Sequence, residues 1–301
     1  MRRLAFFLMV CLLFTLWSNA SEITIGSFKI EWFGVHSRTD EQIRLLADYI
    51  RSLDIDILAC QQISPTCDKS KNGTPDWNDL LRELGSNFAG WHGSTCRPQR
   101  LAFIWRTDRV EVTDLGELKA FKRQEIRGTE ERTFPRIPIT AYVRSLDGGV
   151  DFRIVTVHLY SKEGIIRYAE ATCLNDWIGK YLGGNYDKDV VLIGDCNTKS
   201  MGRDDRHDST TINNIEAGGL FTCISKDHQE YTTLDARERY DHAFLTAEFL
   251  VEYVEGSWDV RRELADQDPD TYESYISDHC PVTLRITDED TDSLPTGDWG
   301  V

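Results

Sequence analysis

Asp195 and Asn197 are the polar pair whose types and spacing point most directly to chemistry. They follow the apolar run 190–193, Val-Val-Leu-Ile, and the turn-forming Gly194. Four consecutive apolar residues predict a strand that is buried on both faces. Side chains two positions apart on an extended chain point the same way. A carboxylate and an amide at the end of a buried strand indicate a catalytic or ligand-holding site, with an ordinary Asp-x-Asn turn as the alternative.

Other polar residues stand at or near the ends of further predicted strands. His158 lies near the end of a strand predicted at 152–159, and Lys29 lies within a strand predicted at 23–33. His158 or His279, taken alone, is better explained as a histidine that is hydrogen-bonded at a strand end. If the strand ends converge, however, their side chains form one polar site at the mouth of a sheet. The residues concerned are Lys29, Gln62, His158, Asp195, Asn197, Asp241, Asp278 and His279.

Strands outnumber helices among the elements that must position this site. Helices are predicted at 39–50, 77–84 and 163–182, the first of them capped by Thr39. Many of the predicted strands adjoin in sequence, so we expect mostly antiparallel sheets with helices packed outside them. The strands are predicted at 23–33, 55–60, 101–105, 137–143, 152–159, 190–193, 241–245, 250–254 and 280–286.

The first twenty residues have the features of a secretory signal peptide. Arg2 and Arg3 precede the apolar segment 4–17, and small residues up to Ala20 suit cleavage after that position. The apolar segment is short for a membrane span, and no later run is long enough to be one. We therefore expect a signal peptide at 1–20, one secreted or periplasmic domain at 21–287 and an acidic tail at 288–301.

The chain is acidic, and seven of its eight cysteines lie outside the signal peptide. A formal charge of -16 repels polyanions, which counts against tight binding to duplex DNA. Export permits disulfides, and an odd number of cysteines leaves at least one thiol unpaired. We expect a Cys67–Cys96 disulfide, a Cys173–Cys223 disulfide as a second candidate, and buried thiols at Cys60 and Cys196.

Four short motifs together resemble those of the endonuclease/exonuclease/phosphatase superfamily. They are Gly194-Asp195-Cys196-Asn197, Ser277-Asp278-His279-Cys280-Pro281-Val282, Val157-His158-Leu159 and Tyr240-Asp241-His242, in the order and approximate spacing of that family. The resemblance covers nearly all of the chain after the signal peptide. It implies a four-layered α/β sandwich, with two mostly antiparallel β-sheets face to face and helices outside. It also implies hydrolysis of phosphate esters with Mg²⁺, Mn²⁺ or another divalent cation.

The resemblance assigns roles to individual residues. His279 would be the general base, oriented by Asp241, and His158 would hydrogen-bond a phosphoryl oxygen or assist the leaving group. Asp195 and Asn197 would hold the attacking water and the scissile phosphate. The implied metal positions are Gln62, Asp195, Asn197 and Asp278, and the implied substrate-binding residues are Arg136 and Arg100.

Two positions depart from the family pattern. The first strand carries Lys29 where the family has asparagine, and the second ends in Gln62 where the family has the glutamate that is its principal metal ligand. A neutral amide is a poorer ligand for a hard cation than a carboxylate. We hypothesise that the Lys29 ammonium occupies or borders the usual metal position, held by Gln62 and by Asp195 or Asp278. The alternatives are drift in a site that is no longer under selection for metal binding, or a metal held by Asp195, Asn197 and Asp278 alone.

Three functions are compatible with these features. The first is an exported, metal-dependent phosphodiester hydrolase, nuclease-like, with a degenerate metal site. The second is a catalytically inactive or altered member of the same fold that binds a partner. The third is a small-molecule phosphatase or phospholipase-like esterase. The expected cofactor is Mg²⁺ or Mn²⁺ if the protein is active, or none because of Lys29 and Gln62. The expected partner is a phosphodiester, with nucleic acid among the candidates.

Overall fold

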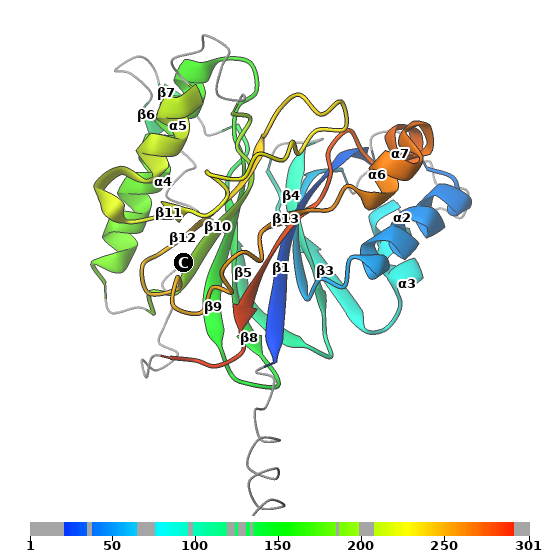
Figure 1. The fold of residues 1–301 in the computed structure, drawn as a ribbon, viewed down its shortest axis with the longest axis horizontal. Coiled ribbons are helices and arrows are strands. Elements are labelled where there is room, and N and C mark those ends of the chain that lie inside the picture. The colour runs from blue at the N-terminus through cyan, green and yellow to red at the C-terminus, as the bar shows by residue number, and fades with distance from the viewer. Residues whose placement is uncertain are drawn as a thin grey trace, which may run out of the picture.

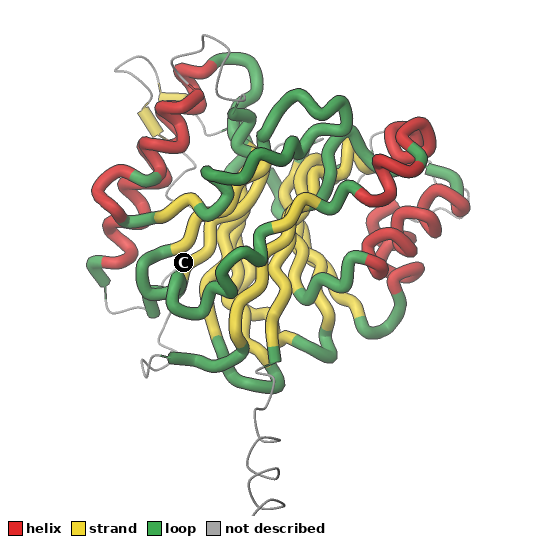
Figure 2. The backbone as a smooth tube through the Cα atoms, in the orientation of Figure 1, coloured by secondary structure: helices red, strands yellow, loops and turns green. Residues whose placement is uncertain are grey.

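Two six-stranded sheets stack face to face in the computed structural model of the chain, with helices on both outer sides (Figures 1 and 2). The structure describes residues 21–34, 38–64, 76–95, 99–118, 124–125, 131–132, 135–184, 187–198 and 208–291. Most strand pairs are antiparallel. The predicted four-layered sandwich is therefore confirmed.

The first sheet contains the strand that carries Lys29. Its order is β13-β14-β1-β2-β4-β3, so the first and last long strands of the chain lie side by side (blue and red in Figure 1). β1 pairs in parallel with β2 and antiparallel with β14. The strands are β1 (Glu22–Phe33), β2 (Ile57–Ile63), β3 (Phe88–His92), β4 (Arg100–Arg106), β13 (Asp259–Val260) and β14 (Val282–Thr287).

The second sheet contains the strands that carry His158, Asp195 and Asp241. Its order is β11-β12-β10-β9-β8-β5, and only β9 and β10 pair in parallel within it. The strands are β5 (Val110–Glu117), β8 (Ile139–Ser145), β9 (Asp151–His158), β10 (Val190–Asp195), β11 (Thr222–Cys223) and β12 (Asp241–Leu245). A separate small ribbon pairs β6 (Gln124–Glu125) with β7 (Glu131–Arg132).

The helices lie on the two outer sides of the sandwich. α2 (Asp40–Ser52), α3 (Asp76–Leu84), α6 (Glu263–Gln267) and α7 (Pro269–Tyr275) lie on the side of the first sheet. α4 (Gly164–Leu182), α5 (Asp208–Ile215) and the short 3₁₀ turn η2 (Ala217–Gly219) lie on the side of the second. Thr39 caps α2 as predicted, because its hydroxyl accepts from Gln42 N while the Gln42 side chain accepts from Thr39 N.

The strand β10 is buried on both faces, as its apolar run predicts. Val191 and Ile193 belong to the core between the two sheets. Val190 and Leu192 belong to a second core that also contains Leu174 of α4. Apolar layers therefore surround the strand that ends in Asp195, which gives the carboxylate a rigid support.

The predicted strand 250–254 is wrong. Leu250 N donates to Thr246 O and Val251 N donates to Glu248 O, so this part of the chain turns. Only an isolated bridge between Tyr253 and Ile286 remains. Leu250 and Tyr253 pack against the core from the turn, which explains apolar residues without a strand. Short elements such as α6, α7 and β13 were not predicted.

The predicted Cys173–Cys223 disulfide is also wrong, because both residues are free thiols and the Cys223 Sγ lies 3.4 Å from the Ser225 hydroxyl. Cys60 and Cys196 are buried free thiols, as predicted. Cys67 and Cys96 lie outside the described residues.

Asp288, where the acidic tail was expected to begin, is buried, and its N–H donates to Ser21 O. Within the described ranges, no helix has the length and apolar character needed to cross a membrane.

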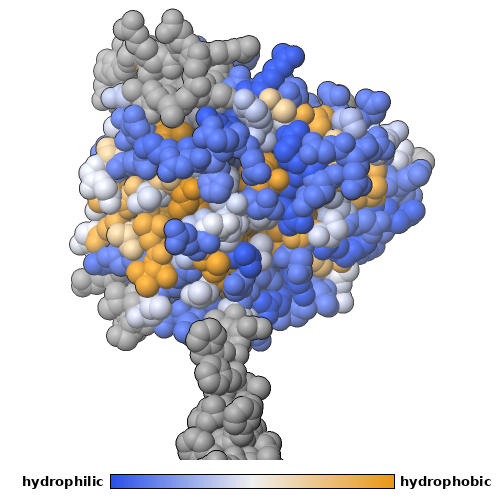
Figure 3. All heavy atoms as spheres, viewed as in Figure 1, coloured by the Kyte–Doolittle hydropathy of each residue, from blue (hydrophilic) through white to orange (hydrophobic). Residues whose placement is uncertain are grey.

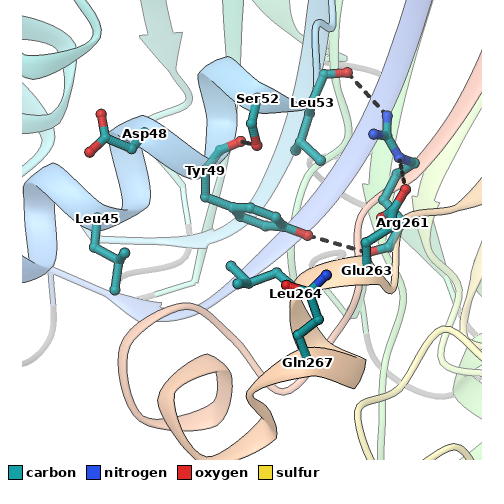
Figure 4. Close-up of a pocket in the computed structure, with 9 residues that line it drawn as sticks. All are labelled: Leu45, Asp48, Tyr49, Ser52, Leu53, Arg261, Glu263, Leu264 and Gln267. Atoms are coloured by element: carbon teal, nitrogen blue, oxygen red, sulfur yellow. Dashed lines mark hydrogen bonds and ion pairs between the residues drawn. The ribbon is translucent and has the colours of Figure 1, made fainter.

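The surface carries polar side chains and an open pocket between α2 and α6. Hydrophilic residues cover much of the face shown in Figure 3, in keeping with a formal charge of -16. The pocket has a volume of about 420 Å³, and Leu45, Leu53 and Leu264 contribute to its lining (Figure 4). Tyr49 closes one side by donating to Arg261 O at 3.2 Å. None of the predicted site residues lines this pocket.

Candidate active site

Three of the predicted site residues form a row across the second sheet. Asp195 ends β10 and is paired in register with His158 on β9 and with Asp241 on β12. Neighbouring strands lie roughly 4.8 Å apart. All three side chains are buried. The sheet register therefore brings together residues that are far apart in the sequence, as the strand-end argument predicts.

The first sheet contributes Lys29 and the loop that precedes β14. The Ser277 hydroxyl donates to Lys29 O at 2.5 Å and accepts from His279 N at 3.1 Å. The Lys29 Nζ contacts both carboxylate oxygens of Asp278 at 2.8 Å. Ser277, which the motif contains but to which no role was assigned, thus fixes the loop against β1.

His279 and Asp241 join the two sheets. The Nδ1 of His279 lies 2.8 Å from the Asp241 Oδ2, and both side chains are buried. The Tyr240 ring stacks on the imidazole at 5.7 Å, and the Tyr272 hydroxyl donates to His279 O at 2.8 Å. Burial opposes protonation of His279, but the charge and hydrogen bond of Asp241, together with the charge of Asp195, outweigh burial, and the pKa of the imidazole is raised. The predicted contact between Asp241 and His279 is present.

Asp195 has one oxygen engaged and one open. Its Oδ1 accepts from Asn197 N at 2.8 Å, and the Asn197 side chain in turn donates to Leu159 O at 2.8 Å. Its Oδ2 has no hydrogen-bond partner, although the Nε2 of His158 lies 3.4 Å away. Burial, together with the nearby charge of Asp241, raises the pKa of Asp195 to about 6. Burial, with the nearby charge of Arg136, lowers the pKa of His158 well below its ordinary value, so this imidazole is neutral.

The two predicted substrate-binding arginines are buried and have different positions. Arg136 donates from Nε to His158 O and from one terminal nitrogen to Leu159 O, both at 2.6 Å. Its other terminal nitrogen donates to the Gln99 side chain at 2.6 Å. Arg136 therefore supports the chain segment that carries His158. Arg100 lies on β4, where it contacts the ring of His92 at 3.3 Å. Binding of substrate by either arginine stays a prediction.

Gln62 lies in a local irregularity of β1 and β2. Pairing between these strands shifts between Lys29 and Phe33, and Trp32 and Gln62 both have positive φ, 44° and 63°. The Oε1 of Gln62 accepts from the Trp32 N–H at 3.2 Å. The amide thus satisfies a backbone donor that the strand irregularity leaves without a ladder partner. Gln62 does not hydrogen-bond the Lys29 ammonium, so this part of the Lys29 hypothesis is wrong.

The predicted metal positions do not fit a divalent ion. Both oxygens of Asp278 contact the Lys29 ammonium, and Gln62 Oε1 is engaged by backbone. Asn197 offers only an amide, and Asp195 only its Oδ2. A positive charge at Lys29 also repels a second cation in a buried site. Across the described parts of the chain, no group of three or more His, Cys, Asp or Glu side chains is arranged to hold a metal ion.

Comparison with known proteins identifies the fold. Neither a family model nor a curated protein sequence matches the chain. Among solved structures, an endonuclease/exonuclease/phosphatase family protein from Bacteroides thetaiotaomicron has a TM-score of 0.62 at 14% identity, over 88% of this chain and 98% of that one. The mannosyl-6-phosphatase Bt3783 of the same organism has a TM-score of 0.62 at 16% identity, over 87% and 98%.

A third similar structure is TDP2 from D. rerio in complex with a single strand DNA product. Its TM-score is 0.59 at 14% identity, over 88% of this chain and 98% of that one. Identities this low establish the fold alone. The chain therefore has the fold of the endonuclease/exonuclease/phosphatase proteins, which confirms the resemblance found in its motifs at the level of architecture.

Proposed function

We propose that this chain is an exported hydrolase of phosphodiesters in which His279 is the general base. The observation that carries the proposal is the buried contact between His279 Nδ1 and Asp241 Oδ2 at 2.8 Å. The other ring nitrogen, Nε2, makes no hydrogen bond within the described residues, so it is available to a water molecule. A histidine whose second nitrogen is held by a carboxylate is well suited to take a proton near neutral pH.

The chain's own residues account for the proton transfer. Water bound at His279 Nε2 loses a proton to the imidazole as its oxygen attacks phosphorus, and Asp241 stabilises the imidazolium that forms. Two open acceptors, Asp195 Oδ2 and Asp241 Oδ1, are buried without hydrogen-bond partners. Unpaired buried carboxylate oxygens are costly, and a bound water or a protonated leaving group would satisfy them.

Phosphodiesters are the substrate class that we propose, and nucleic acid is one candidate. TDP2, which has the same fold, is solved with a single strand DNA product. The formal charge of -16 favours short or single-stranded substrates over long duplexes, because the electrostatic cost of approach rises with the number of phosphates. The same acidity supports a second candidate, a small phosphate monoester, and the mannosyl-6-phosphatase is a protein of this fold whose name states such a substrate.

We propose that the metal site of the fold family is degenerate in this chain. The fold family uses divalent cations, whereas here Gln62 replaces a carboxylate and Asp278 is engaged by Lys29. No step of the proposed reaction is therefore assigned to a bound metal. Export rests on residues 1–20, with two arginines ahead of an apolar segment and small residues up to Ala20.

Activity assays on two alanine variants test the proposed function. The substrates are bis-p-nitrophenyl phosphate, p-nitrophenyl phosphate, single-stranded DNA, plasmid DNA and RNA, each with Mg²⁺, with Mn²⁺ and with EDTA. His279→Ala should lower the hydrolysis rate by roughly 10²- to 10⁴-fold, the usual contribution of a general base. Asp195→Ala removes an open buried acceptor of the same site and should also abolish most of the hydrolysis. Asp54→Ala is the control and should retain the rate, because the Asp54 side chain is 84% exposed and pairs with Arg106. Absence of any hydrolysis by the natural protein would favour a binding role instead.

A further inference from the structure

Lys29 places a positive charge inside the site. It lies on β1 opposite Gln61 of β2, and its side chain is only 8% exposed. Both oxygens of Asp278 lie 2.8 Å from its Nζ. A buried ammonium is costly unless it is paired, and this symmetric contact with a carboxylate supplies the pairing. Burial raises the pKa of Asp278, but attraction by Lys29 and His279 and the hydrogen bond from Lys29 together outweigh burial, and the pKa is lowered.

The ammonium retains an unused hydrogen-bond donor. A lysine ammonium has three N–H groups, and the two Asp278 oxygens account for two of them. Among the described residues, no further acceptor contacts Nζ. Lys29 is nevertheless joined to His279, because it holds Asp278, the residue before His279, and the Ser277 hydroxyl links Lys29 O to His279 N. His279 in turn contacts Asp241, which is paired in register with Asp195. The open donor therefore belongs to the same site as the open Nε2 of His279 and the unpaired Asp195 Oδ2.

This combination of open groups matches a phosphate ester and a water molecule. A non-bridging phosphoryl oxygen is an anionic acceptor, which suits the remaining N–H of Lys29. The attacking water is a donor, which suits His279 Nε2. A divalent cation would normally neutralise the phosphoryl charge in this fold family, but here an ammonium held by Asp278 is already in the site. A fixed lysine can perform the same electrostatic stabilisation.

We propose that Lys29, held by Asp278, replaces the divalent cation by binding a non-bridging phosphoryl oxygen, so that the site binds phosphate and works without metal. This inference deepens the proposed function and rests on it for the hydrolytic step. In that step the water oxygen forms a bond to phosphorus and the bond to the leaving oxygen breaks. The proton of the water passes to His279 Nε2 and from there to the leaving oxygen. Lys29 exchanges no proton and remains an ammonium throughout.

Hydrolysis by metal-free protein is the first test. The natural protein, dialysed against EDTA, should cleave bis-p-nitrophenyl phosphate at the same rate with and without added Mg²⁺ or Mn²⁺. Lys29→Met should lower that rate by roughly 10²-fold or more, as expected for loss of a donor that stabilises transition-state charge. Arg285→Met is the matched control. It removes one positive charge from β14 of the same sheet, where Arg285 pairs with Glu22, and should leave the rate unchanged.

Binding measurements provide a readout that does not depend on turnover. By phosphorus NMR or calorimetry, inorganic phosphate should bind the natural protein and Arg285→Met equally. Its affinity for Lys29→Met should be at least about tenfold lower, because a charge-assisted hydrogen bond is lost. Calorimetry with Mn²⁺ should show no binding to the natural protein and clear binding to the double variant Lys29→Asn, Gln62→Glu, which restores a carboxylate and removes the repelling charge.

The outcomes separate this inference from the proposed function. Hydrolysis that requires Mg²⁺ or Mn²⁺, together with tight Mn²⁺ binding by the natural protein, would overturn the role of Lys29 and leave the phosphodiesterase intact. Phosphate binding that depends on Lys29 in a protein that hydrolyses nothing would retain the anion site and overturn the hydrolase. Phosphate affinity equal in the natural protein and Lys29→Met, with both variants folded by circular dichroism, would overturn the anion site itself.

Discussion

Substitution of Asp241 by asparagine isolates the part that the carboxylate plays in the action of His279. The change conserves size but removes a charge that lies 2.8 Å from the His279 Nδ1 in a buried setting. A hydrogen bond to a charged group contributes roughly 1.5–3 kcal/mol. Since about 1.4 kcal/mol corresponds to a tenfold change in rate, kcat should fall by roughly 10- to 150-fold.

The pH profile separates an electrostatic role of Asp241 from a merely structural one. His279 must be neutral to accept a proton, so the rate should rise with pH as the imidazolium is lost. In the natural protein burial lowers the pKa of His279, but attraction by Asp241, the hydrogen bond to it and the charge of Asp195 together outweigh burial and raise the pKa. Asp241→Asn removes that attraction, so the rising limb of the profile should move to lower pH while the plateau drops.

The assay is kcat for bis-p-nitrophenyl phosphate as a function of pH, with near-UV circular dichroism to verify the fold. Asp54→Asn is the control, because the Asp54 side chain is 84% exposed and pairs with Arg106 away from the site. Its plateau and its rising limb should match those of the natural protein. A folded Asp241→Asn variant whose limb does not move, or whose kcat falls less than about threefold, would refute the assignment of His279 as a base held by Asp241.

Two further predictions concern stability and export. At Gly194, φ is 152° and a Cβ would lie 2.2 Å from the Val157 carbonyl oxygen, so Gly194→Ala should lower the free energy of unfolding in urea by roughly 3 kcal/mol or more. Gly85→Ala, with φ of 99° and nothing within 4 Å of the added carbon, should cost less, and equal losses would contradict the steric argument. For export, N-terminal sequencing of the secreted or periplasmic protein should begin at Ser21, and a mature form that retains the apolar segment 4–17 would indicate an anchor.

The fold and the row formed by His158, Asp195 and Asp241 could be predicted because their determinants are local. The apolar run of β10 and its buried position on both faces follow from consecutive residues. The motifs around His158, Asp195, Asp241 and His279 each end or begin a strand. Strand pairing places the ends of neighbouring strands side by side at one edge of a sheet. Local patterns that put polar residues at strand ends were therefore enough to indicate one site.

The remaining features depend on contacts that no local pattern encodes. Lys29 and Asp278 are separated by 249 residues, and their pairing follows from β1 and β14 being neighbours. The hydrogen bond from Trp32 N to the Gln62 side chain depends on the positive φ of Trp32. A tryptophan gives no indication in the sequence that its φ will be positive. The turn at 247–252 has the composition of a strand because its apolar residues pack on the core from a non-extended chain.

Side chains of the protein hold together the two halves of the site, one on each sheet. Gln61 is fully buried, and its side-chain nitrogen donates to Ser27 Oγ and to Thr156 Oγ1, both at 3.0 Å. Ser27 lies two residues before Lys29 on β1, and Thr156 lies two residues before His158 on β9, so each pair shares a face of its strand. One amide therefore links the sheets directly beneath the candidate site, and the contact between His279 and Asp241 links them within the site. With both links in place, side chains of the protein join the two sheets both at the site and beneath it.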